Sequence, residues 1–162
     1  MFTIVLVEPK IPPNTGTIAR LCAATNIKLD LVGDLGFSLD DKSLKRAGLD
    51  YWHLMDIEHH PSKNDYIKQL NPEQFILLTT KSDKPYYEYK FKKNDYLIFG
   101  SETLGLDEDL LNLYSKRCYT IPMKNKNKGL RSLNLAVSTG IVLYEGLRQI
   151  SFKNKKTDII QV

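Results

Sequence analysis

Short apolar runs that recur along the chain constrain its fold more than any other feature. The first run, Thr3–Val7, is continuous and rich in β-branched residues, which is typical of a strand buried on both faces of a parallel sheet. Similar runs predict further strands at Lys28–Val32, 74–78, Tyr96–Phe99 and 119–121. We therefore expect a parallel sheet of several short strands.

Helical patterns separate these runs. They cover residues 15–24, 39–47, 64–70, 108–114 and 133–150. Because strands and helices alternate, the sequence predicts the α/β class. A chain of 162 residues has the size of one domain, so we expect a single domain at 1–150 and a polar tail at 151–162.

The last predicted helix carries apolar residues on more than one face, among them Leu135, Val137, Ile141, Tyr144 and Leu147. A helix that is apolar nearly all round is expected to be buried nearly all round. A domain of this size offers little to cover such a helix, so a second copy of the chain is the expected cover. The sequence thus predicts a homodimer.

The composition is that of an ordinary soluble protein, with 42% hydrophobic and 26% charged residues. The first residues form an apolar run that ends at Glu8 and contain neither a basic leader nor a cleavage site. We expect a cytoplasmic protein without a membrane segment. Cys22 and Cys118 lie among apolar residues, which favours two buried free thiols over a disulfide.

The ionisable residues give weaker signals. His53, His59 and His60 lack further ligands at zinc-site spacing, so we expect a solvated loop there and no metal. The net charge of +4 favours an anionic partner only slightly. The basic residues form three clusters, each of which alone is explained as a solvated face. The clusters are Lys42, Lys45 and Arg46; Lys124, Lys126, Lys128 and Arg131; and Lys153, Lys155 and Lys156.

Three segments follow predicted strands, at the edge of a parallel sheet where ligands bind. In the first segment, 8–20, Asn14 is placed to cap the helix that follows. Arg20 stands among apolar residues, so its guanidinium either reaches solvent or faces an anion. The sequence favours neither explanation.

The second segment, 98–106, has Gly100 and Gly105 on either side of Glu102. Glycines after a strand let the backbone turn sharply and approach a ligand closely. The segment is neither a phosphate-binding P-loop nor the dinucleotide fingerprint, which argues against a nucleotide-dependent oxidoreductase.

The third segment runs from strand 119–121 into the last helix. Ser132 is a suitable N-cap for that helix. Asn134, just inside the helix, is a poor helix former, which indicates a hydrogen bond to a ligand or to a distant residue.

Together these segments resemble the SPOUT superfamily of RNA methyltransferases, in particular the small single-domain branch that methylates the ribose 2′-oxygen of the tRNA wobble nucleotide. Each motif alone is weakly specific, but their shared order and spacing over most of the chain is a strong signal. The matching motifs are 8–20, Gly36-Phe37, 46–51, Gly100-x-Glu102-Thr103-x-Gly105 and Ser132-x-Asn134-Leu135.

The resemblance implies a C-terminal trefoil knot, an obligate homodimer and a pocket for S-adenosylmethionine, which leaves as S-adenosylhomocysteine. Cofactor contacts, many through backbone groups, would fall on Leu78, Thr79, Gly100, Glu102, Gly105, Ile121, Met123, Ser132 and Leu133.

For the chemistry, the resemblance points to Asn14, Arg20, Glu102, Ser132 and Asn134. A ribose hydroxyl is a weak nucleophile and the sulfonium methyl is already activated, so positioning the two supplies much of the acceleration. A guanidinium essentially never deprotonates in proteins. We therefore expect Arg20, from its own or the neighbouring subunit, to orient the target phosphate or ribose.

The resemblance also implies that tRNA is the partner. Lys124, Lys126, Lys128 and Arg131 would hold phosphates beside the pocket, and Lys42, Lys45 and Arg46 would contact the anticodon stem.

Two departures from the family pattern concern these RNA contacts. Leu104 stands where arginine is expected, and the loop 124–131 is longer and more basic than in close relatives. Since fold and cofactor site do not define the substrate, two alternatives stay open: 2′-O-methylation at another tRNA or ribosomal RNA site, and a non-catalytic RNA-binding module. Methyl transfer to RNA separates the enzymes from the binding module.

Overall fold

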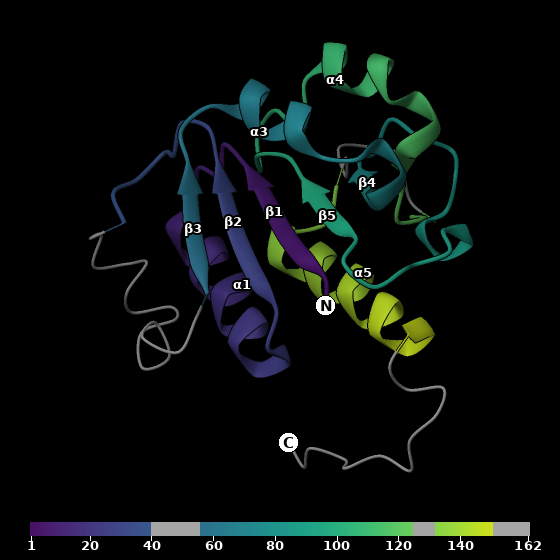
Figure 1. Cartoon of the computed structure of the whole chain (residues 1–162), viewed down its shortest axis with the longest axis horizontal. Coiled ribbons are helices and arrows are strands. Elements are labelled where there is room, and N and C mark those ends of the chain that lie inside the picture. Colours follow the sequence, from purple (N-terminus) through teal and green to yellow (C-terminus); the bar gives the residue numbers. More distant parts are fainter. Residues whose placement is uncertain (40–55, 125–131, 151–162) are drawn as a thin grey trace.

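The protein contains one six-stranded sheet in the order β3-β2-β1-β5-β4-β6. Figure 1 labels the strands of this sheet from β3 to β4. The structure is a computed structural model that describes residues 1–39, 56–124 and 132–150. Every pairing between neighbouring strands is parallel, as predicted. The strands are β1 Thr3–Val7, β2 Lys28–Val32, β3 Ile57–His60, β4 Phe75–Leu78, β5 Tyr96–Phe99 and β6 Cys118–Tyr119.

One strand contradicts the sequence prediction. His59 and His60 were expected in a solvated loop, but they lie in β3, which pairs with β2. Ile57 is the one apolar residue of this strand. An edge strand with so little apolar character gives no periodic signal, and its pairing partner is distant in sequence.

In the described residues, four α-helices connect or follow the strands. They are α1 Pro12–Thr25, α3 Lys63–Gln69, α4 Glu108–Leu113 and α5 Leu135–Ile150. Each begins and ends within a few residues of a predicted helix. The helix predicted at 39–47 lies almost entirely outside the described residues.

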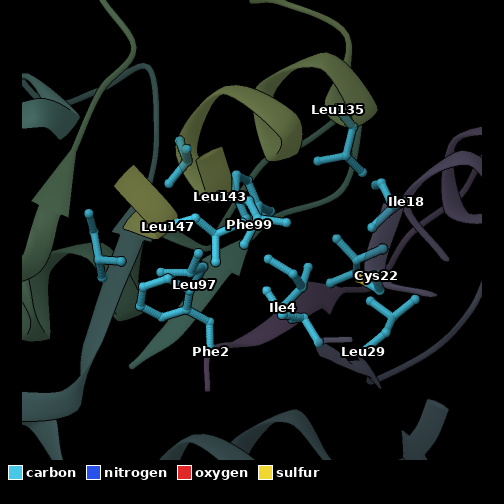
Figure 2. Close-up of a cluster of buried hydrophobic side chains, with 14 of the residues drawn as sticks. Phe2, Ile4, Ile18, Cys22, Leu29, Leu97, Phe99, Leu135, Leu143 and Leu147 are labelled. Carbon is cyan, nitrogen blue, oxygen red and sulfur yellow. The ribbon is translucent and has the colours of Figure 1, made fainter. Parts of the chain in front are cut away.

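The helices cover both faces of the sheet. Alternate residues of β1 point to opposite faces, so Ile4 and Leu6 belong to one core cluster and Val5 and Val7 to another. The first cluster packs beneath α1 and α5, which Figure 2 shows with Ile18 of α1 and Leu143 of α5 facing the strands. The second cluster packs against α3 and α4. The strands β1, β2, β4 and β5 are therefore buried on both faces, as predicted, whereas the edge strand β3 is not.

Both cysteines are buried and free, which confirms the prediction. Cys22 lies in α1, and burial raises the pKa of its thiol to about 12. Burial also raises the pKa of Cys118. Among the described residues, no helix combines the length and apolar character needed to cross a membrane.

Helix α5 is less completely covered than predicted. Its residues Leu135, Val142, Leu143 and Leu147 are buried, but Val137 and Tyr144 are each 51% exposed. The prediction of nearly complete burial is thus wrong for a single copy of the chain. The exposed strip is the place where the sequence predicts a second subunit.

The topology positions the site. Because the strands are parallel, the carboxyl ends of β1, β4, β5 and β6 lie at the same edge of the sheet. After β1 the chain adds β2 and β3 on one side, and later strands fill the other side. Ligands of open α/β sheets bind at such a switch in strand order, here between β1 and β5.

Candidate active site

A cavity of about 440 Å³ lies at the carboxyl ends of β4, β5 and β6. The starts of α1 and α5 form part of its wall. All nine residues predicted to contact the cofactor line this one cavity: Leu78, Thr79, Gly100, Glu102, Gly105, Ile121, Met123, Ser132 and Leu133. Sequence reasoning missed further lining residues, including Ile11, Lys81, Thr120 and Ser138.

A tight glycine turn forms one wall of the cavity. The amide of Gly105 donates a hydrogen bond of 2.9 Å to the carbonyl of Ser101, and Gly105 has a φ of +72°. A Cβ atom at Gly100 would lie only 2.1 Å from the carbonyl carbon of Gly105. The turn therefore requires glycine at both positions: at Gly105 because of its positive φ, and at Gly100 because there is no space for a side chain.

The carboxylate of Glu102 ties this turn to the start of α1. Its Oε2 accepts a hydrogen bond from the amide of Lys10 (2.9 Å), and its Oε1 accepts from the amide of Ile11 (3.2 Å). Oε1 also accepts from the side-chain amide of Asn14 at 3.0 Å. Both carboxylate oxygens are thus engaged in holding two segments together.

Asn134 extends this arrangement to α5. Its Oδ1 accepts hydrogen bonds from the amides of Ala136 (2.9 Å) and Val137 (3.3 Å), which caps the helix. Its Nδ2 donates to Oδ1 of Asn14 at 2.9 Å. Of the two explanations that the sequence left open for Asn134, a ligand or a distant residue, the structure shows a hydrogen bond to a distant residue. We call Glu102, Asn14 and Asn134 the Glu102 network.

The two helix caps predicted from sequence are wrong. Helix α1 begins at Pro12 with Ile11 as N-cap and has no side-chain cap, because Asn14 lies inside the first turn and turns to Glu102. Helix α5 begins at Leu135, so Asn134 occupies the cap position that was expected for Ser132. Ser132 lies on the cavity wall instead.

Of the cationic residues predicted to act in the site, the structure describes only Arg20 and Lys124. Arg20 is exposed on α1 and does not line the cavity of this chain. Lys124 is exposed just beyond Met123 of the cavity wall. The other residues predicted to bind RNA lie outside the described residues; they are Lys42, Lys45, Arg46, Lys126, Lys128 and Arg131.

A second polar group, which sequence reasoning missed, lies between β2, β3 and α3. We call Lys28, Asp30, Glu58, His60 and Tyr66 the Lys28 cluster. One ligand atom each from Asp30, Glu58 and His60 lies within 4.8 Å of the others, a spacing that could hold a metal ion. The ammonium of Lys28 already supplies positive charge there, 3.2 Å from Asp30 and 2.6 Å from Glu58.

The charges of the Lys28 cluster reinforce one another. The hydrogen bond from Lys28 and its charge hold the pKa of Glu58 below its usual value. Burial and the hydrogen bond to Asp30 raise the pKa of Tyr66 far above the ordinary value. The available sequence signal was Asp30, a charged residue in the middle of an apolar strand.

The parallel strands and the helices on both faces define an α/β protein. Its cavity lies at the carboxyl ends of the strands, between a glycine turn and the starts of two helices, which is where proteins of this class bind ligands. The chain belongs to the SpoU rRNA Methylase family, whose model matches residues 1–144. The resemblance to RNA methyltransferases is thereby confirmed.

Individual relatives match over nearly their full length. The tRNA (cytidine(34)-2'-O)-methyltransferase of Saccharophagus degradans is 43% identical, over 96% of this chain and 100% of the relative. The enzyme of the same name from Escherichia coli K12 is 40% identical, over 94% and 96%. A structure solved to study the 2-OH methylation of C/U34 on tRNA has a TM-score of 0.86 at 38% identity and covers 94% of this chain and 98% of that chain.

Proposed function

We propose that this chain transfers a methyl group from S-adenosylmethionine to the ribose 2′-hydroxyl of the tRNA wobble nucleotide, position 34, at cytidine or carboxymethylaminomethyluridine. The observation that carries the proposal is the single cavity that gathers nine predicted cofactor residues beside the Glu102 network. The relatives named for methylation of cytidine 34 support the same substrate.

The cavity fits the proposed cofactor. Its volume of about 440 Å³ falls within the range of small-molecule sites. Its wall combines apolar side chains such as Leu78 and Ile121 with backbone exposed by Gly100 and Gly105, which suits an adenosine held largely by main-chain groups. When bound, S-adenosylmethionine supplies an electrophilic methyl group and leaves as S-adenosylhomocysteine.

The residues of this chain then act by positioning. Glu102 and Asn134 hold Asn14 at the cavity wall, and Ser132 lies on the same wall. Fixing the reacting groups in position before the reaction raises the rate by several orders of magnitude when a weak nucleophile meets an activated group. A guanidinium stays protonated in proteins, so Arg20 cannot accept the hydroxyl proton, which leaves late in the reaction or to solvent.

The proposal includes a homodimer in the cytoplasm, with residues 1–150 as its methyltransferase domain. The exposed Val137 and Tyr144 of α5 would pack against the second subunit. Arg20 does not reach the cavity of its own chain, so in the dimer it would orient the target ribose or phosphate at the partner's cavity. The trefoil knot and the phosphate contacts of the basic residues belong to the same proposal.

A ribosomal RNA substrate is the second candidate, because the matching family is described as one of rRNA methylases. The decisive experiment incubates the protein with labelled S-adenosylmethionine and tRNA from a host that lacks the enzyme, and then maps the labelled nucleotide with nucleases. Label at the wobble ribose establishes the proposal. Label at another position or in ribosomal RNA moves the target, and bound cofactor without transfer supports the non-catalytic RNA-binding module.

The role of Arg20 has its own test. Replacing Arg20 by Lys keeps the charge but removes the planar fork that binds a phosphate or ribose through two hydrogen bonds. We expect methyl transfer to fall about tenfold or more. Full turnover by the variant would rule out the positioning role.

A further inference from the structure

Three apolar side chains lie exposed at the mouth of the cavity. Leu104 is 82% exposed, Ile11 is 41% exposed and Leu133 is 39% exposed, and all three line the cavity. Among the large hydrophobic residues that the structure describes, Leu104 has the greatest exposure. We call these three residues the apolar rim. Solvent-exposed apolar surface around a binding cavity indicates a contact with a ligand or partner.

The apolar rim is held in place by the groups that form the site. Leu104 lies in the glycine turn, where its amide donates to Oγ of Ser101 at 3.2 Å. The amide of Ile11 donates to Glu102. Leu133 precedes Asn134, which is bonded to Asn14. The rim therefore unites three segments that are distant in sequence, in fixed positions relative to the cavity.

The charges near the rim argue against a phosphate as its occupant. Both oxygens of Glu102 accept hydrogen bonds from the chain itself. The ammonium of Lys81, which also lines the cavity, is 2.8 Å from the carboxylate of Glu108. Apart from Lys124 beyond Met123, the described part of the mouth thus presents apolar surface and engaged charges, which suits the flat face of a nucleobase better than an anion.

We propose that Leu104 and Ile11 of the apolar rim pack against the nucleobase of the nucleotide whose ribose is methylated, whereas Leu133 is also one of the predicted cofactor contacts. This inference rests on the proposed function: a ribose 2′-oxygen that enters the cavity brings its own base to the mouth. Flipped or unstacked bases are held by apolar as well as aromatic side chains. Apolar packing does not read the hydrogen-bonding edge of a base, so the rim accepts cytidine and uridine alike.

The test measures binding of an anticodon hairpin by fluorescence anisotropy and compares it with the same hairpin carrying an abasic wobble nucleotide. In wild-type protein, loss of the base should weaken binding about tenfold, the effect of exposing a leucine-sized apolar contact. Leu104→Ser should bind the complete hairpin about tenfold more weakly and the abasic hairpin with wild-type affinity. Leu104→Met should behave as wild type.

Leu113→Ser is the matched control, because Leu113 is 73% exposed and does not line the cavity. Its hairpin affinity should equal that of wild type. Equal loss of affinity for both hairpins in Leu104→Ser would overturn the proposal. Weaker binding of S-adenosylmethionine by this variant would also overturn it and would assign the rim to the cofactor. Dissociation of the variant's dimer would overturn it as well and would assign the rim to the second subunit. If the wild-type protein binds both hairpins with equal affinity, the proposed contact between the rim and the base is overturned, but the proposed function is not. Methylation mapped elsewhere in the RNA overturns the proposed function.

Discussion

The Glu102 network and the Lys28 cluster are both polar groups, but they differ in their surroundings and in the role we expect of them. In the Lys28 cluster, Asp30 is 2% exposed, bonds to Tyr66 and pairs with Lys28. Ion pairs with Lys28 join Asp30 and Glu58 there, whereas Nε2 of His60 is buried without a hydrogen-bond partner among the described residues. The Glu102 network instead fixes backbone amides and two side-chain amides around a cavity that stays open.

The two groups are therefore expected to contribute differently to stability and to activity. Removing one partner of a buried charge is strongly destabilising, because the remaining charge is left uncompensated. A network that orients segments around a cavity contributes less to folding, because most of its atoms lie near solvent, but it fixes the geometry on which a reaction depends. We therefore expect variants of the Lys28 cluster to lose stability and variants of the Glu102 network to lose activity.

The largest effect is expected for Lys28→Met. The substitution leaves the carboxylate of Asp30, whose side chain is 3% exposed, without its cation. The free energy of unfolding should fall by about 3 kcal/mol in urea titration, while methyl transfer per folded molecule stays unchanged. Lys81→Met is the control for stability alone, since Lys81 lines the cavity; the pair Lys81–Glu108 is well exposed and should contribute little to stability. A loss of activity without a loss of stability in Lys28→Met would contradict the distinction.

Glu102→Gln should show the converse behaviour. One oxygen becomes an NH2 group that cannot accept, so the side chain loses either the bond from Lys10 or the bonds from Ile11 and Asn14, and the turn and α1 shift relative to each other. Methyl transfer should fall about 100-fold, as expected for a displacement of about 1 Å at a site that acts by positioning. The urea midpoint should move much less than in Lys28→Met. If unfolding were the main effect, the network would be a stability device like the Lys28 cluster.

Tyr66→Phe removes one bond of the Lys28 cluster and keeps the ring. The hydroxyl of Tyr66 donates to Oδ2 of Asp30 at 2.5 Å in a buried setting. Loss of a hydrogen bond to a buried carboxylate should lower the free energy of unfolding by about 2 kcal/mol, measured by the same titration. Tyr87→Phe is the control, since Tyr87 is 54% exposed. An equal effect of the two substitutions would show that the bond to Asp30 is not important for stability.

The smallest effect separates two roles of one residue. Asn134→Ala removes both the cap of α5 and the bond to Asn14, and it should cost about 1 kcal/mol of stability. Asn134→Ser restores an oxygen for the cap but does not reach Asn14. We expect near wild-type stability in the serine variant with methyl transfer as low as in the alanine variant. Recovery of both properties together would show that Asn134 acts only as a cap.

Much of this molecule could be predicted from local sequence patterns. The strands β1, β2 and β5 have the predicted bounds, because a buried parallel strand is a continuous apolar run. The lining residues of the cavity followed from a resemblance carried by ordered motifs. The edge strand β3 and the Lys28 cluster could not be predicted, because their partners are brought together only by the pairing of β2 with β3.

The two wrong helix caps have a similar cause. Asn14 and Ser132 were assigned from the residues next to them, whereas the partners of Asn14 are Glu102 and Asn134. A side chain that has both a local and a distant hydrogen-bonding option is decided by tertiary structure. The polar residues of the site are therefore harder to predict than the apolar residues of the core.

The long reach of the Glu102 network has a consequence for synthesis of the protein in the cell. Glu102 lies 88 residues after Asn14, and Asn134 lies 120 residues after it. A nascent chain can form the bonds of Glu102 only after residue 102 has left the ribosome, and the bond of Asn134 only after residue 134 has, and contacts between such distant residues form slowly. The site is therefore assembled late, so that a truncated or incompletely folded copy would retain much of the sheet but lack the geometry for catalysis.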